Sequence, residues 1–75
     1  MFSSSAEKLE KKIKGLNAVK GEYRSDLEES EKLFKRREMD REQFERIKSR
    51  NEEHIERINE KIRECHAKMQ EMRKK

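Results

Sequence analysis

Apolar residues recur along this chain at alternating spacings of four and three. The first run is Leu9, Ile13, Leu16, Lys20, Tyr23, Leu27, Ser30 and Phe34, and the second is Phe44, Lys48, Asn51, Ile55, Ile58, Ile62, Cys65, Met69 and Met72. This heptad spacing is typical of helices that bury one narrow stripe against a partner helix. The predicted interaction seam is its apolar subset: Leu9, Ile13, Leu16, Tyr23, Leu27, Phe34, Phe44, Ile55, Ile58, Ile62, Cys65 and Met69. The polar residues at seam positions weaken a coiled coil but fix its register.

The two runs predict an all-α fold, a two-helix antiparallel coiled-coil hairpin that forms one domain over residues 1–75. Helix one is expected at about 5–36, the turn at 37–40 and helix two at about 41–73. Asp40 followed by Gln43 matches a capping box at the start of helix two, with Met39 and Phe44 placed for a hydrophobic staple, and Ser4 with Glu7 matches a capping box at the start of helix one. The alternative is one continuous helix, against which the cap at Asp40 and the break in the heptads argue.

A hairpin that closes near Met39 predicts which residues face each other. The pairs are Phe34 with Phe44, Tyr23 with Ile55, Leu16 with Ile62, Ile13 with Cys65, and Leu9 with Met69.

Two glycines lie within helix one, Gly15 and Gly21. Each costs roughly 1 kcal/mol relative to alanine in a helix interior. We interpret this segment as locally loose or slightly bent. The alternative is a close approach of another backbone over Gly15 and Ala18.

The residues around the turn resemble the short helical turn of the SHOCT family. The family pattern is matched by Leu33, Met39, Asp40, Glu42, Phe44 and Lys48. Arg37 stands where the family usually has glycine, and the closing leucine pair is absent, with Asn51 and Glu52 near its place. The resemblance covers about sixteen residues, Leu33 to Lys48, and implies a helix–turn–helix hairpin used for oligomerisation or interaction, without known catalysis.

Composition agrees with a coiled coil better than with a globular core. Of the 75 residues, 51% are charged and 29% are hydrophobic, and none is proline. The single cysteine excludes an internal disulfide and fits a reducing compartment, so we expect a cytoplasmic protein. No apolar run is long enough for a membrane span, and the N-terminus lacks the apolar core of a signal peptide.

The net charge of +4 is unevenly placed. Folding the hairpin concentrates basic residues at both ends and acidic residues at the middle, or waist. Candidate phosphate contacts are Lys8, Lys11, Lys12, Lys35, Arg36, Arg37 and Arg41. The alternative, which we favour, is a solvated exterior in which opposite charges alternate, as in Glu53 and Arg57. No recognised nucleic-acid-binding motif is present.

Few residues offer chemistry. Cys65, His66, His54, Met69 and Met72 form the only soft-ligand cluster, and a closed zinc site needs four ligands, so we expect no metal and no cofactor. His54 beside the seam either senses pH or is a solvated histidine, and we favour the latter. Carboxylate pairs such as Glu52 and Glu53 lack the desolvated pocket that acid–base catalysis needs, so we expect no enzyme.

These features predict a non-enzymatic structural or protein-interaction module that self-associates. Val19, Leu33, Met39 and Ile47 flank the strict seam and would be partly wet in a monomer. A homodimer packed as a four-helix bundle would cover them, and another protein is a further candidate partner. The alternative function is a basic nucleic-acid-associated protein. A third possibility is a coiled-coil arm of a larger assembly.

Overall fold

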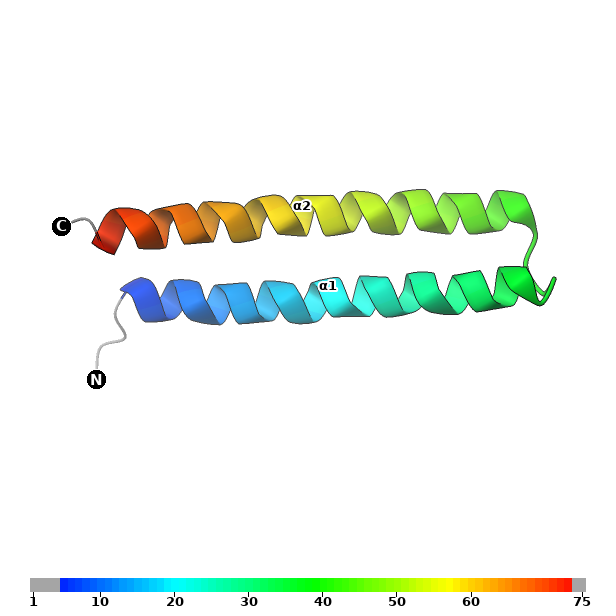
Figure 1. Cartoon of the computed structure of the whole chain (residues 1–75), viewed down its shortest axis with the longest axis horizontal. Helices are drawn as coiled ribbons and strands as arrows, with labels where there is room; N and C mark the ends of the chain where they lie inside the picture. Colours follow the sequence, from blue (N-terminus) through cyan, green and yellow to red (C-terminus); the bar gives the residue numbers. More distant parts are fainter. Residues whose placement is uncertain (1–4, 74–75) are drawn as a thin grey trace.

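The computed structural model describes residues 5–73, which form two long helices joined by a short turn. Helix α1 is Ser5–Lys35 and helix α2 is Arg41–Arg73. They pack side by side in opposite directions, with the start of α1 and the end of α2 at one end of the rod and the turn at the other (Figure 1). The molecule measures 55 × 22 × 12 Å. The expected all-helical hairpin is confirmed, and residues 5–73 contain no strand.

Three contacts between the helices fix their register. The rings of Phe34 and Phe44 stack with centroids 4.8 Å apart, which confirms the pairing expected beside the turn. Further along, Tyr23 stacks on His54, and the Lys20 ammonium donates a hydrogen bond to Asn59 Oδ1 at 3.1 Å. In each pair the residue numbers sum to 78 within one, so the register expected from a turn near Met39 holds from the turn past the waist. Tyr23 was expected opposite Ile55, and its stacking partner is the adjacent His54.

Helix α1 ends one residue before the expected Arg36, in a Schellman motif. Glu38 N–H donates to the Leu33 carbonyl at 2.9 Å, and Arg37 N–H donates to the Phe34 carbonyl at 3.0 Å. These bonds satisfy carbonyls that the helix end leaves without partners. This pair of hydrogen bonds requires a residue with a left-handed backbone conformation just before Glu38. Arg37 adopts that conformation, with a φ of 62°.

Helix α2 begins at the expected cap. The Asp40 carboxylate accepts a hydrogen bond from the Gln43 backbone N–H at 2.7 Å, which satisfies one of the free donors of the first turn. Phe44 N–H then donates to the Asp40 carbonyl and starts the helical ladder. The cap expected for helix one depends on Ser4, which lies outside the described residues.

The glycines of α1 accommodate no neighbouring backbone of this chain. A Cβ placed on Gly15 or Gly21 would meet no atom within 4 Å, beyond its immediate neighbours and its own helix backbone. The alternative of a close approach over Gly15 is therefore wrong within the hairpin. Neither glycine has a positive φ, so neither is required by the backbone conformation.

Candidate interaction surface

The seam is covered only in part. Ile58, Cys65 and Met69 are its buried residues, and the other nine seam residues are half-buried. No described side chain is less than 2% exposed. Two helices can shield the seam from above and below but leave it open along both sides, because each helix is only about 10 Å wide.

Two positions of the second heptad run do not pack as the spacing predicted. Lys48 is exposed, and Ile47 is half-buried in its place. An α-helix has about 3.6 residues per turn, so a strict heptad drifts around its surface and an adjacent apolar residue can replace a polar one. Met72 is 42% exposed because it lies in the last turn of α2, where α1 offers little cover.

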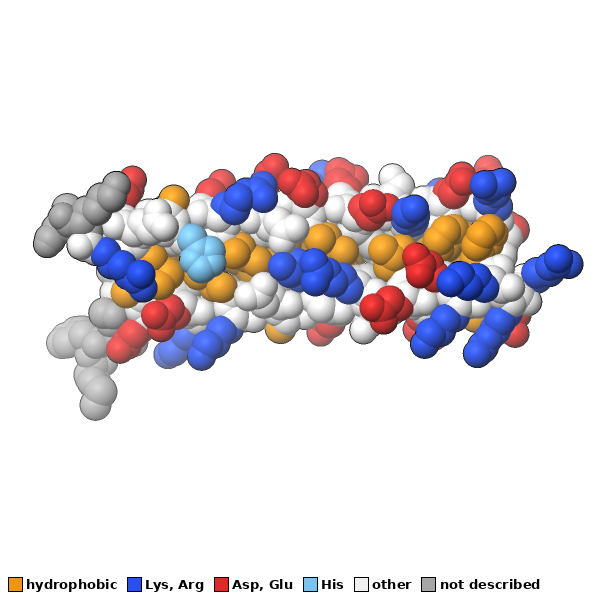
Figure 2. All heavy atoms as spheres, viewed as in Figure 1, with side chains coloured by type: hydrophobic (Ala, Val, Ile, Leu, Met, Phe, Trp, Pro, Cys, Tyr) orange, Lys and Arg blue, Asp and Glu red, His pale blue; other side chains and the backbone are white. Residues whose placement is uncertain are grey.

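Apolar side chains remain visible along the groove between the helices. Figure 2 shows a nearly continuous hydrophobic stripe running along the rod, bordered on both sides by basic and acidic side chains. Outside the strict seam, Val19 is 41% exposed, while Leu33, Met39 and Ile47 are half-buried. These four side chains, which we expected to be partly exposed to solvent in a monomer, are partly exposed in the structure.

One side of the hairpin is hollowed near the waist. This depression, the flank groove, lies between α1 and α2 and is lined by Asp26, Glu29, Ser30, Leu33, Ile47, Arg50 and Asn51. Its floor is made by Ser30 and Asn51, which are 7% and 6% exposed. Small and polar side chains at these two seam positions leave room that larger apolar ones would fill.

The polar seam residues have hydrogen-bond partners. Asn51 Nδ2 donates to the Tyr23 carbonyl of α1 at 3.3 Å, and no described buried side-chain N or O lacks a partner. Lys20, half-buried, reaches across to Asn59, a residue that the heptad spacing did not single out. These bonds penalise a shift of one helix along the other, because a shift would leave buried polar groups unpaired.

His54 contributes to the helix contact. Its ring stacks on Tyr23 with a centroid distance of 4.8 Å and an interplanar angle of 8°. The sequence left two interpretations of this half-buried residue, a pH sensor or a solvated histidine. The structure adds a third, a packing role in the seam. The spacing of His54, seven residues after half-buried Ile47, is the signal that could have placed it there.

The charged exterior is paired unevenly. The four ion pairs found within residues 5–73 are Arg41–Glu45, Arg46–Glu42, Arg57–Glu53 and Arg63–Glu56, all within α2. Of the seven candidate phosphate contacts, Arg41 therefore has a carboxylate partner at 3.4 Å. All seven are exposed, and folding splits them between the open end (Lys8, Lys11, Lys12) and the turn (Lys35, Arg36, Arg37, Arg41).

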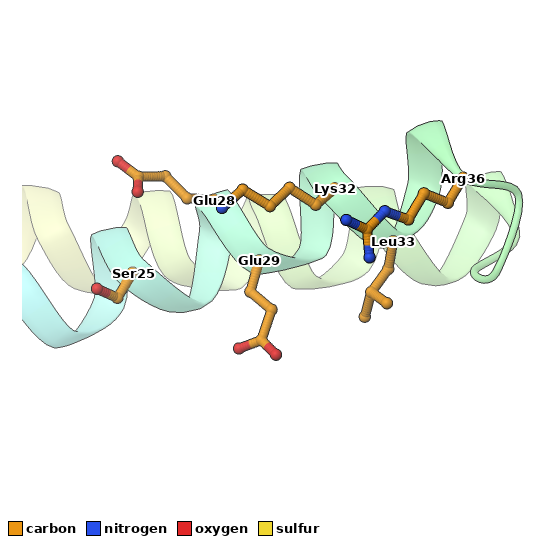
Figure 3. Close-up of a pocket in the computed structure, with 6 residues that line it drawn as sticks. All are labelled: Ser25, Glu28, Glu29, Lys32, Leu33 and Arg36. Carbon is orange, nitrogen blue, oxygen red and sulfur yellow. The ribbon is translucent and has the colours of Figure 1, made fainter.

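Other surface depressions are shallow and bring no reactive groups together. One lies on the outer side of α1, where Glu29 and Leu33 point to one side while the Arg36 side chain folds back toward Lys32 (Figure 3). Another lies at the turn, between Phe34 and Asp40. Within residues 5–73 no three side chains among His, Cys, Asp and Glu gather in a way that would hold a metal ion. Cys65 is buried with a free thiol.

Neither helix, as far as the chain is described, combines the length and the apolar character needed to cross a membrane. No protein-family model, curated protein or solved structure matches this chain. The resemblance to the SHOCT turn therefore stays a prediction. Its glycine position coincides with left-handed Arg37, a conformation that favours glycine.

Proposed function

We propose that this chain is a non-enzymatic interaction module that works by self-association, two hairpins packing as a four-helix bundle. The observation that carries the proposal is the open seam. Only three apolar side chains among residues 5–73 are buried, while the remaining apolar residues of the stripe stay partly exposed to solvent. Covering them with a second apolar stripe would contribute about 25 cal/mol for each Å² removed from water.

The exposed area supports a partner of substantial size. A compact monomer of 9.2 kDa exposes about 4,900 Å² by the usual size scaling, whereas this chain exposes 6525 Å². The excess of about 1,600 Å² is roughly twice the 800 Å² that one partner buries in a standard interface. The hairpin therefore has enough surplus surface to bury a full interface and remain solvated elsewhere.

Sedimentation equilibrium and thermal melting at several concentrations test the proposal. We expect a mass of twice 9.2 kDa at tens of micromolar and a melting temperature that rises with concentration, as mass action requires. A monomer with a concentration-independent melt would contradict self-association. The partly exposed apolar stripe would then be the leading candidate surface for binding another protein.

A second candidate function is phosphate-backbone binding through the basic ends. It is favoured by the turn, where Lys35, Arg36 and Arg37 are exposed and form no ion pair with a described carboxylate. It is opposed by the acidic residues interleaved with them, among them Glu38 and Asp40. Titration of labelled duplex DNA and RNA decides the matter, since binding to phosphates weakens steeply with salt. An interaction module would show little binding even at low salt.

A further inference from the structure

The two sides of the flank groove carry opposite charge at the same height along the rod. Asp26 and Glu29 line it from α1, and Arg50 lines it from α2. Seven-residue spacing extends both sides toward the open end, to Glu22 on α1 and Arg57 on α2. Glu22, Asp26 and Glu29 form the acidic strip, and Arg50 with Arg57 forms the basic strip.

Within the hairpin the centre of these strips is unpaired. Asp26, Glu29 and Arg50 are exposed, and none takes part in the ion pairs found within residues 5–73. Arg57 holds Glu53 of its own helix. At the turn-ward end of the groove, half-buried Leu33 of α1 and Ile47 of α2 offer apolar surface at matching heights. The groove thus presents an apolar end and a two-sided charged middle.

We propose that a second copy of this chain docks on the flank groove with both turns at the same end of the dimer. This inference rests on the proposed self-association and specifies its surface and orientation. A two-fold axis parallel to the rod places α1 of each copy on α2 of the other. The acidic strip then meets the partner's Arg50 and the partner's Arg57, and Leu33 packs near the partner's Ile47.

The opposite orientation, with turns at opposite ends, is disfavoured by charge. A two-fold axis across the rod lays α2 on α2 of the other copy. Where the flank grooves meet in this orientation, Arg50 faces the partner's Arg50, while Asp26 and Glu29 of α1 face the partner's Glu29 and the partner's Asp26. Like charges placed opposite each other across an interface are costly. The same-end orientation avoids this by setting acidic against basic.

Charge reversal in the groove tests the docking surface. Arg50→Glu should weaken the dimerisation constant at least tenfold, measured by sedimentation equilibrium at low salt. Lys48→Glu is the matched control, since Lys48 is exposed, two residues away and not among the groove residues, and it should leave the constant within threefold. Asp26→Lys should also weaken self-association. A mixture of Arg50→Glu and Asp26→Lys chains should form a heterodimer, because each supplies the charge that the other lacks.

A distance measurement tests the orientation. Glu71 is exposed near the open end of α2, so Glu71→Cys in a Cys65→Ala background accepts one spin label per chain. Turns at the same end predict label separations below roughly 30 Å, from the width of two packed hairpins. Turns at opposite ends predict separations above roughly 40 Å, because Glu71 then lies fourteen or more residues from the two-fold axis, at a rise of 1.5 Å per residue. Sedimentation of the labelled chain must return the same mass as the unmodified chain.

The possible outcomes distinguish a failure of the docking geometry from a failure of the proposed self-association. A dimer that has distant labels, or that Arg50→Glu leaves intact, would overturn the docking geometry while self-association stands. A chain that is monomeric at all concentrations would overturn both. A dimer with close labels, weakened by Arg50→Glu and restored in the mixture, supports both.

Discussion

Arg37 occupies a left-handed conformation, with a φ of 62°, that disfavours residues with a Cβ atom. The two Schellman hydrogen bonds from Arg37 and Glu38 impose this conformation, because they form only if the chain reverses at this point. The penalty for an L-residue is about 1–2 kcal/mol, and glycine avoids it.

Replacing Arg37 by glycine should therefore stabilise the hairpin. Part of the gain is offset by the greater freedom of glycine in the unfolded chain, so we expect about 0.5–1 kcal/mol in urea or thermal unfolding. Arg36→Gly is the matched control: it removes the same charge from a neighbour that lacks a positive φ, and it should not stabilise. Equal gains from both would mean that charge, not backbone conformation, is responsible.

Asp40 is the second residue on which the turn depends. Its carboxylate accepts the Gln43 N–H at 2.7 Å, so Asp40→Ala should cost about 1 kcal/mol of unfolding free energy. Asp40→Ser keeps an oxygen acceptor at the cap and should recover most of the loss. If serine restores nothing, the cap is not the source of the effect.

Of the two helices, α2 holds the three apolar residues that are buried within residues 5–73, namely Ile58, Cys65 and Met69. Ile58→Ala should cost about 2–5 kcal/mol, the range for a buried isoleucine. Ile62→Ala, at a half-buried position, should cost less. Arg63→Ala removes an ion pair whose side chains are more than 60% exposed, and it should cost under about 1 kcal/mol. The reverse order in chemical denaturation would place the seam on the wrong side of α2.

Helix α1 is weakened by its two glycines, which face open space. Gly15→Ala and Gly21→Ala should each stabilise by about 0.5–1 kcal/mol, because alanine restricts the unfolded chain and meets no neighbour in the folded one. Ala18→Gly, between them, should destabilise by a similar amount. Loss of stability in Gly15→Ala would indicate that another chain packs there in the assembled state.

Heptad spacing and the cap at Asp40 together predicted the two helices and their register, since heptad runs of matched length admit few pairings and the cap marks the turn. It did not predict that Ile47 would replace Lys48, because helical drift chooses between adjacent positions only when the partner helix is in place. The left-handed conformation of Arg37 could not be predicted either, because arginine has no preference for that conformation. The flank groove could not be predicted either: Asp26 and Glu29 look like any other surface acids until α2 brings Arg50 beside them.

For the whole molecule, shape and polar seam residues together set how hairpins can assemble. The radius of gyration is 17.0 Å, whereas a compact domain of this length has about 11 Å, so the rod exposes its sides along their full length. Such sides admit many packings that differ by a shift along the rod. Specificity must then come from features that occur once per chain, and the flank groove is such a feature.

Asn51 is the polar residue that best fits this role. It is 6% exposed and donates to the Tyr23 carbonyl across the helix interface. Buried asparagine at a seam position is known to fix register and partner number at a cost in stability. Asn51→Leu should therefore raise the melting temperature, because leucine fills the floor of the groove beside Ser30 and adds apolar burial.

The same substitution should loosen the assembly. Without the polar contact, shifted packings lose their penalty, so we expect Asn51→Leu to sediment as a mixture of species while the unmodified chain gives one. Asn51→Asp separates the two effects: it keeps the size of the side chain, replaces the amide donor with a charge that burial disfavours, and should lower stability. A less stable Asn51→Leu chain that still forms a single species would show that Asn51 stabilises the hairpin directly and does not select its assembly.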